Sequence, residues 1–244
     1  MPKKMGEALK TVVGDGYEEE EERKGRIESV LMNPNREMIF QFLIYHPCSH
    51  MRKIANELNM SPPTVKWHLE KLKAGGYVNS ALVKNKKVFY PSRMVAEGEA
   101  VSLLEAVNRD RIGVTFLAIL ENQGSTQSDI AKMLGLSTQS VRGYITTLER
   151  VELITTIVDG KHKRYFPSDK LKKMEKSMRK RIRTFRRFLI KKLEKDRLNP
   201  SIDLSRRRET DITIIVSKRT SKIKIPDEPF TSSVISMIGG EGVS

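Results

Sequence analysis

The sequence predicts a mainly α-helical fold with small β wings, and three observations lead to it. Apolar residues recur at helical spacing in several segments, and short runs of β-forming residues follow them. Residues 37–94 are repeated as residues 113–170, with matched positions such as Ile54 and Ile130 separated by 76. A long segment without Gly or Pro, residues 169–197, follows the second copy. We therefore expect two tandem domains, a long basic helix and a small C-terminal β unit.

The first copy begins with two helical segments. A short pattern over Arg26–Met32 is interrupted at Asn33-Pro34-Asn35, and Arg36–Tyr45 then has the apolar pattern of a buried helix. His46-Pro47-Cys48-Ser49 is expected to form the turn into the next helix, whose apolar stripe starts at Ile54.

A third helix is predicted to follow Ser61. This residue is a good N-cap, and Pro62 suits the first helical position because its missing N–H costs nothing there. Apolar residues then recur at i, i+4 and i+7 from Val65, and Gly75-Gly76 ends the helix. The opposite face of this helix is expected to be exposed.

Two β-forming runs, Tyr77-Val78 and Val88-Phe89-Tyr90, flank the polar turn Lys84-Asn85-Lys86-Lys87. Three helices followed by such a hairpin are the order of elements in a winged helix-turn-helix domain. In this motif the last helix is shaped to enter the major groove of DNA.

The second copy aligns with the first without a gap from the second helix to the end of the wing. Its matched positions are the expected core and cap positions, whereas the exposed positions differ. A shared fold with two different surfaces is the simplest account. The expected elements are helices at Gly113–Asn122, Ser128–Leu134 and Thr138–Arg150, a turn and cap at Gly135-Leu136-Ser137, and a wing turn at Asp159-Gly160-Lys161, which contains an Asp-Gly hairpin signal.

The long helix after the second copy carries most of the excess charge. Between Lys170 and Arg197 there are about 14 Lys or Arg and about three Asp or Glu, a net charge of about +11. Its apolar stripe has a period near 3.6, so it could pack on its own domain or on a symmetry mate. Asn199-Pro200 is expected to end the helix.

The remaining segments complete the organisation. Glu97–Asn108 is expected to be a helical connector or part of a dimer face, and Glu18–Glu22 forms an acidic block. Strands are expected at Asp211–Val216 and Ile223–Ile225, joined near Arg219–Ser221. The predicted parts are a disordered acidic tail (1–25), a first winged helix-turn-helix domain (26–94), a helical connector (95–112), a second domain (113–168), a long basic amphipathic helix (169–197), a small β-hairpin unit (198–230) and a tail (231–244).

The composition favours a polyanionic partner. Charged residues are 31% of the 244 residues, hydrophobic residues are 38%, and the formal net charge is +15. This balance predicts nucleic acid first and an anionic membrane surface second. One cysteine, Cys48, permits no intramolecular disulfide, and neither a signal peptide nor a transmembrane segment is predicted. We expect a cytoplasmic, nucleoid-associated protein without a membrane role.

The two copies resemble archaeal transcriptional regulators with tandem winged helix-turn-helix domains, in the broad ArsR/MarR-like class. The resemblance covers roughly residues 26–168 and implies the fold and DNA binding, without naming a target or an effector. The first copy lacks a glycine in its wing turn, and the second has Val151-Glu152 in place of Gly-Gly. The matching stretches are NPNREMIFQFLIYHPCSHMRKIANELNMSPPTVKWHLEKLKAGGYV and FLAILENQGSTQSDIAKMLGLSTQSVRGYITTLERVELI.

In the first copy, candidate DNA contacts lie on the face of the third helix opposite Val65. At about 100° per residue, Pro63 and Trp67 point away from the core. Trp67 could contact thymine methyls or sugars, or pack under the wing. Lysines beside it could reach phosphates or guanine edges. The candidates are Pro63, Thr64, Lys66, Trp67 and Lys71 on the helix, and Lys84, Lys86 and Lys87 on the wing.

The matching face of the second copy offers Gln139 and Arg142, which can read adenine and guanine by bidentate hydrogen bonds. Gly143 stands where the first copy has Trp67, and it opens this surface. This copy is either a second reader of DNA or a packing or dimer domain. The candidates are Thr138, Gln139, Arg142, Lys161, Lys163 and Arg164, with Arg179, Arg183 and Arg186 on the long helix.

No catalytic or metal site is predicted. His46, Cys48 and His50 form an HxCxH triplet, but the sequence offers no clustered fourth ligand for Zn²⁺ or Cu⁺. It also lacks the phosphate-loop, metalloprotease and nucleophile-elbow motifs. We therefore expect no cofactor and no enzymatic activity.

The sequence favours a sequence-specific DNA-binding transcriptional regulator. Its expected partner is double-stranded DNA, a homodimer is compatible with the pattern, and no effector is identified. Two alternatives stay open. One is an architectural nucleoid protein with little sequence preference. The other is an interaction module of the transcription or replication machinery that uses its winged-helix surfaces for protein contacts.

Overall fold

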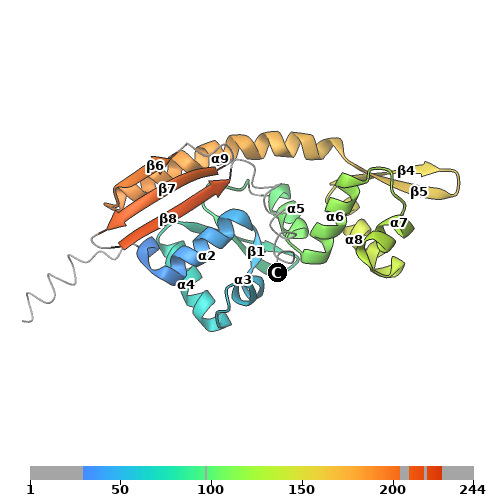
Figure 1. Ribbon diagram of the computed structural model, residues 1–244. Helices are drawn as coiled ribbons and strands as arrows, with labels where there is room; N and C mark the ends of the chain where they lie inside the picture. The colour runs from blue at the N-terminus through green and yellow to red at the C-terminus, as the bar shows by residue number, and fades with distance from the viewer. Residues whose placement is uncertain (1–29, 97, 204–208, 217–218, 227–244) are drawn as a thin grey trace, which may run out of the picture.

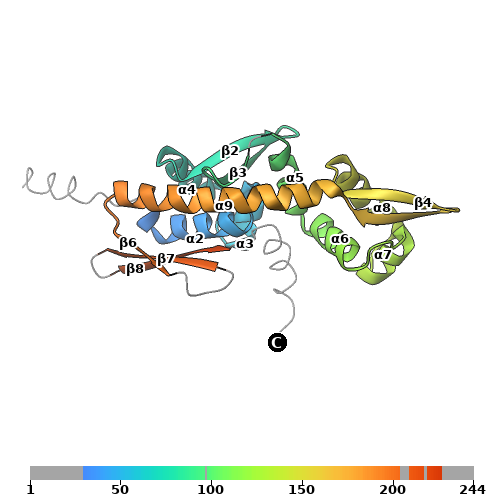
Figure 2. The ribbon, with the colours of Figure 1, turned by 90° about the horizontal axis from the view of Figure 1, so that it is seen from above.

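The computed structural model describes residues 30–96, 98–203, 209–216 and 219–226. Two winged-helix units are joined by the short helix α5 (Glu99–Val107), and the long helix α9 (Asp169–Lys195) spans both of them (Figure 1). A small β-sheet lies beside the first unit (Figure 2). The predicted tails, 1–25 and 231–244, with the acidic block Glu18–Glu22, fall outside the described residues.

The two units repeat the same elements. After a short 3₁₀ turn, η1 (Val30–Met32), the first unit consists of α2 (Pro34–Tyr45), β1 (Ser49–His50), α3 (Met51–Glu57), α4 (Pro62–Ala74), β2 (Val78–Val83) and β3 (Lys86–Pro91). The second unit consists of α6 (Asp110–Glu121), α7 (Gln127–Leu134), α8 (Thr138–Arg150), β4 (Ile154–Asp159) and β5 (His162–Pro167). The starts of α2 and α6, of α4 and α8, and of the paired wing strands are each 76 positions apart. The repeat therefore extends from the first helix to the end of the wing.

Both units start their first helix earlier than predicted. The helix α2 begins at Pro34 rather than Arg36, because the side chain of Asn33 caps it by accepting two backbone N–H groups at 3.1 and 3.2 Å. The Asn-Pro-Asn segment thus starts the helix instead of interrupting it, as an N-cap followed by Pro does. The helix α6 likewise begins at Asp110 rather than Gly113.

The predicted turn before α3 contains a short strand. Ser49 pairs with Phe89, so β1 joins the wing in an antiparallel sheet of order β1-β3-β2. A strand of two residues is too short for alternation of apolar and polar side chains to mark it. The second unit has an isolated bridge at the matching place, between Thr126 and Arg164.

The wing turns are two residues long in both units. Lys84 and Asn85 connect β2 to β3, and both adopt a left-handed backbone, with φ of 47° and 62°. In the second unit Asp159 is still paired in the strand, so the connecting residues are Gly160 and Lys161. The predicted Asp-Gly turn is therefore displaced by one position, and the glycine takes the first turn residue with φ of 57°.

The apolar stripe of α9 is buried on its own molecule. The rings of Phe185 and Phe40 are 6.4 Å apart between centroids. Just after the helix, Asp196 accepts a hydrogen bond from the Tyr77 hydroxyl at 2.5 Å, and Lys192 Nζ lies 4.9 Å from the centroid of the Tyr77 ring. The helix that follows the second unit therefore returns to pack on the first. The buried residues of the stripe are Leu171, Met178, Ile182, Phe185, Leu189 and Leu193.

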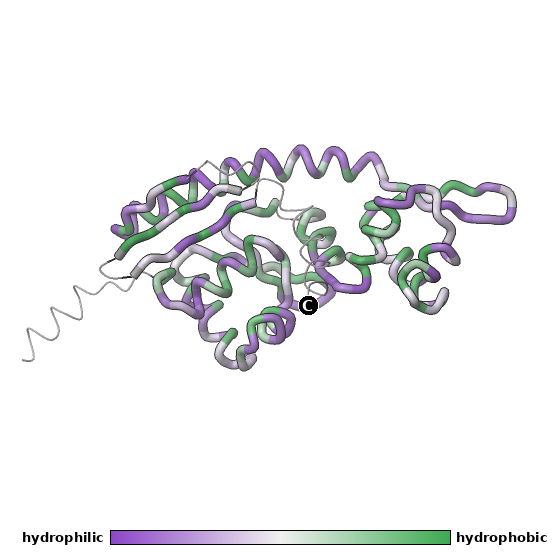
Figure 3. The backbone as a smooth tube through the Cα atoms, viewed as in Figure 1, coloured by the Kyte–Doolittle hydropathy of each residue, from purple (hydrophilic) through white to green (hydrophobic). Residues whose placement is uncertain are grey.

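Most of α9 is nevertheless hydrophilic along its length (Figure 3). Its buried stripe alternates with a large number of Lys and Arg residues that face solvent. Within the described residues, no helix is both long enough and apolar enough to cross a membrane.

The prediction of a C-terminal hairpin is wrong in one respect, because the segment forms three antiparallel strands. They are β6 (Pro200–Asp203), β7 (Glu209–Val216) and β8 (Arg219–Pro226), in that order across the sheet. The predicted turn Arg219–Ser221 lies inside β8. Gln41 of α2 holds the edge of this strand: its side-chain amide donates to the carbonyl of Lys224 and accepts from the N–H of Lys224, both at 2.9 Å.

Candidate nucleic-acid interface

The orientation of α4 is set by its cap and its apolar stripe. The side chain of Ser61 accepts the N–H of Thr64 at 3.2 Å, which confirms the predicted N-cap. Val65, at the centre of the predicted stripe, is fully buried. These constraints turn the predicted contact face outward. Pro63, Lys66, Trp67 and Lys71 are exposed, and Thr64 is half-buried.

Trp67 is 50% exposed, and two cations lie near its ring. Lys71 Nζ is 5.5 Å and the guanidinium carbon of Arg36 is 6.0 Å from the centroid of the indole ring. Both distances fall in the range of cation–π attraction. Burial, and next the charge of Arg36, lowers the pKa of the neighbouring His68. Half of the indole surface remains available to a partner.

The first wing carries lysines into solvent. Lys84, Lys86 and Lys87 are all exposed. Leu82 is 71% exposed and pairs with Lys87 across the hairpin. The wing tip therefore combines cations with an apolar side chain, a combination that suits the phosphates and sugars of a nucleic-acid backbone.

The helix α8 has the same kind of cap as α4, because the side chain of Ser137 accepts the N–H of Ser140 at 3.1 Å. An added Cβ at Gly143 would meet nothing within 4 Å. The surface is thus open where α4 carries Trp67. The predicted contacts Thr138, Gln139 and Arg142 are all exposed.

The predicted contacts on the second wing are of two kinds. Lys161 and Lys163 are exposed at the tip. Arg164 instead makes contacts within the protein: its Nε donates to the carboxylate of Asp159 at 2.6 Å, and its Nη1 donates to the carbonyl of Gly124 at 3.1 Å. Arg164 therefore ties the wing to the loop before α7.

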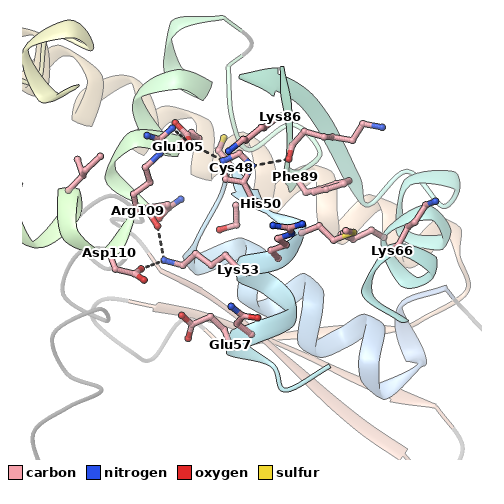
Figure 4. A pocket seen from close by; sticks show the side chains of 18 of the residues that line it. Cys48, His50, Lys53, Glu57, Lys66, Lys86, Phe89, Glu105, Arg109 and Asp110 are labelled. Atoms are coloured by element: carbon pink, nitrogen blue, oxygen red, sulfur yellow. Dashed lines mark hydrogen bonds and ion pairs between the residues drawn. The ribbon is translucent and has the colours of Figure 1, made fainter. Parts of the chain in front are cut away.

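A cleft of about 1200 Å³ lies between the two units (Figure 4). Residues of α3, α4 and β3 form one wall, and residues of α5, α6 and Tyr144 of α8 form the other. Eight Lys or Arg and four Asp or Glu line it, so the cleft is cationic. Three of the cations, Lys66, Lys86 and Lys87, were predicted as DNA contacts. The sequence reasoning missed Arg52, Lys53, Lys73, Arg109 and Arg111.

Two of the four carboxylates of the cleft are already paired (Figure 4). Glu105 is 3% exposed; its Oε1 accepts Arg109 Nε at 2.7 Å and lies 2.9 Å from His50 Nε2. Lys53 pairs with Asp110. In the described part of the chain, the following cleft cations have no carboxylate partner: Arg52, Lys66, Lys73, Lys86, Lys87 and Arg111.

The candidate residues of α9 lie apart from this cleft. In Figure 1, α9 runs along the side of the molecule opposite α3, α4 and α8, and in Figure 2 it passes in front of the first unit. Arg179 and Arg183 are exposed. Arg186 is half-buried, and burial, followed by the charge of Arg183, lowers its pKa. The structure does not bring these three residues together with the other candidates.

The HxCxH triplet does not converge on one point. Burial, and next the charge of Lys53, lowers the pKa of His46 to about 4. Burial also raises the pKa of the Cys48 thiol, and His50 is bound to Glu105. Across residues 30–96, 98–203, 209–216 and 219–226, no three His, Cys, Asp or Glu side chains are grouped so that they could hold a metal ion.

Comparisons with known proteins find similarity in both units. Residues 32–79 and 117–155 match the family model of winged helix-turn-helix DNA-binding domains. The uncharacterized HTH-type transcriptional regulator MJ1398 of Methanocaldococcus jannaschii is 26% identical over 149 residues, which are 61% of this chain and 37% of that protein. The chain therefore spans little more than a third of the length of this relative.

Two solved structures are also similar to parts of the chain. Reduced HlyU from Vibrio cholerae N16961 is 25% identical, with a TM-score of 0.29, and the match covers 31% of this chain and 80% of that one. The transcriptional regulator SlyA is 19% identical, with a TM-score of 0.26, and the match covers 38% and 69%. The two segments matched by the family model of winged helix-turn-helix DNA-binding domains contain α3 with α4 and α7 with α8, so the similarity covers the corresponding helix pair of each unit.

Proposed function

We propose that the protein is a sequence-specific DNA-binding regulator of transcription, in which α4 and α8 are the recognition helices. The observation that carries the proposal is the pairing of two capped helices with a cationic cleft between their units. The exposed side chains of both helices can make contacts in the major groove. The unpaired cations of the cleft are suited to the phosphate backbone.

The two recognition helices have different chemistry to offer to base edges. On α8, Gln139 can hold adenine and Arg142 can hold guanine through two hydrogen bonds each. On α4, the half-exposed ring of Trp67 can pack on thymine methyls or sugars, beside Lys66 and Lys71. A single chain would then bind two unlike half-sites, so its target need not be a palindrome.

Salt titration on two duplexes tests this function. A preferred duplex is selected by the purified full chain from a random pool, and its binding is compared with that of a scrambled duplex of the same composition. We expect the preferred duplex to bind at least about 1000-fold more tightly than the scrambled one. The logarithm of the affinity should fall with the logarithm of the salt concentration for both duplexes, because phosphate contacts are common to both. Equal affinity for the two duplexes would favour an architectural protein, and failure to bind either would overturn the proposal.

Charge reversal in one unit at a time tests whether both helices read DNA. Each triple variant is expected to lower affinity for the selected duplex by about 100-fold, because three favourable phosphate or base contacts become repulsive. A unit whose variant binds normally is not a reader. The first-unit variant is Lys66→Glu, Lys71→Glu, Lys86→Glu, and the second-unit variant is Arg142→Glu, Lys161→Glu, Lys163→Glu. The matched control, on the far side of the molecule, is Lys173→Glu, Lys180→Glu, Lys191→Glu.

A further inference from the structure

The outward side of α9 forms a continuous row of cations, the outer ridge. Its members recur at spacings of three and four residues, so they share the helix face opposite the buried stripe. They extend over about 27 Å, from a rise of 1.5 Å per residue. All six are exposed. The outer ridge consists of Lys173, Lys176, Lys180, Arg183, Arg187 and Lys191.

The outer ridge is electrostatically unsatisfied. Glu152 pairs with Lys170 and Asp196 with Lys192. The three carboxylates of α9 itself, Asp169, Glu175 and Glu194, form no ion pair with a ridge residue. None of the six ridge residues has a carboxylate partner in the part of the chain that the structure describes. Six adjacent cations repel one another. Binding of a polyanion to this face is therefore favourable, because it removes the repulsion and releases the counterions of the polyanion.

The outer ridge cannot share a duplex with the recognition helices. The buried stripe of α9 faces the two units, and the ridge therefore points away from them. The helices α9 and α2 lie between the ridge and the exposed face of α4. They pack against each other through the rings of Phe185 and Phe40. In Figure 1 α9 runs along one side of the molecule and the recognition helices lie on the other, and in Figure 2 α9 passes in front of the first unit. A straight duplex held in the cleft would not reach the ridge.

Other partners fit this surface less well. A helix that lies on a membrane inserts its apolar face into the lipid. In α9 that face is already covered, since Phe185, Leu189 and Leu193 are fully buried. Pairing with α9 of a second copy would bring two rows of like charge together, which is repulsive. A negatively charged rod with regularly spaced phosphates is the partner that matches a straight cationic row.

We propose that the outer ridge binds the phosphate backbone of a second DNA segment, so that one molecule bridges two duplexes. The proposal rests on the proposed function, which supplies the first duplex. Binding at the ridge has no base-reading group beside the cations, so it is insensitive to sequence and strongly weakened by salt. One consequence is that a site-bound protein holds a neighbouring or looped stretch of DNA.

A capture experiment tests the bridge. A duplex that contains the selected site is fixed to beads, the full chain is added, and the retention of a fluorescent duplex of random sequence is measured at low and at moderate salt. The ridge variant changes all six residues to Gln. We expect it to bind the single selected duplex within about threefold of wild type but to lose at least 10-fold in capture of the second duplex. A charge-preserving variant, with Arg at each ridge lysine and Lys at Arg183 and Arg187, should capture normally.

The outcomes separate the two proposals. Unchanged capture by the Gln variant would overturn the role of the ridge. An equal loss of single-duplex affinity would show that the ridge contacts the same duplex, which also overturns the bridge. Retention of phosphatidylserine vesicles in place of the second duplex would do the same. If wild type binds one duplex tightly but captures no second one, the bridge fails and the proposed function stands; if it binds no duplex, the proposed function fails first.

Discussion

The two winged-helix units keep a left-handed backbone at four matching turn positions while changing the residues that adopt it. Four positions with left-handed φ in the first unit have counterparts 76 residues later, and every pair contains one glycine and one other residue. The pairs are Cys48 and Gly124 (67° and 86°), Asn59 and Gly135 (50° and 61°), Gly76 and Glu152 (75° and 55°), and Lys84 and Gly160 (47° and 57°).

This difference shows that the turn geometry, rather than glycine itself, is what the fold requires. A left-handed conformation costs a non-glycine residue about 1–2 kcal/mol, which the packing around the turn can offset. Glu152 illustrates this, since its carboxylate pairs with Lys170 at 2.9 Å and its carbonyl accepts the hydroxyl of Ser168 at 2.5 Å. The two units therefore share a backbone and differ in surface and in local stability.

The largest expected difference in stability lies at the end of the first helix, where the first unit has His46 and the second has Asn122. The pKa of His46 is about 4 in the folded chain, against 6.5 as its ordinary value. The unfolded chain therefore binds the proton first as pH falls. The stability contributed by neutral His46 is complete above pH 6.5 and is lost as pH falls toward 4. The loss is about 2–3 kcal/mol between pH 7 and 4.5.

Single substitutions at these two positions measure the contribution of His46 to the pH dependence of stability. With His46→Asn, the free energy of unfolding should depend less steeply on pH between 7 and 4.5, as followed by urea denaturation at each pH. The matched control is Asn122→His, which places a histidine at an exposed position and should leave the pH dependence as in wild type. Equal pH profiles for wild type and His46→Asn would mean that His46 is solvated in the folded chain.

A smaller difference is expected at the exposed faces of α4 and α8. Trp67→Ala should lower the affinity for the selected duplex by about 10-fold while changing the free energy of unfolding by less than about 1 kcal/mol, because half of the ring is exposed. Anisotropy measures the affinity, and urea denaturation measures the free energy of unfolding. A large loss of stability with unchanged affinity would make Trp67 a packing residue.

Gly143→Ala on α8 should stabilise the chain by about 0.5–1 kcal/mol, since a Cβ there meets nothing within 4 Å and Ala favours the helix. Urea denaturation measures this change in the free energy of unfolding.

Local signals account for the elements that the sequence predicted well. Ser61 and Ser137 mark the starts of α4 and α8, because their side chains cap the helices from within a few residues. The long helix was equally visible, since it has a regular apolar stripe and no Gly or Pro over its length. The constant offset between the copies then carried each element of one unit over to the other.

Features that depend on distant pairing could not be read in the same way. The strand β1 exists because Ser49 meets Phe89, and neither residue marks the pairing locally. The cationic cleft joins residues as far apart as Arg52 and Arg111, which come together through the packing of α5 and α6 against the first unit. In the sequence Arg164 is a wing cation like any other candidate DNA contact. Its hydrogen bonds to Asp159 and Gly124 depend on how the second wing folds.

A last difference between the units isolates the backbone requirement itself. Gly135 ends α7 with φ of 61°, and a Cβ added there meets nothing within 4 Å, so any cost of Gly135→Ala comes from the left-handed conformation. We expect a loss of about 1 kcal/mol in the free energy of unfolding. Gly135→Asn should cost less, because Asn59 holds the matching turn at 50° in the first unit and Asn tolerates this region better than Ala. Equal losses for the Ala and Asn variants, measured by urea denaturation, would mean that solvent exposure or helix propensity, and not backbone conformation, sets the cost at this turn.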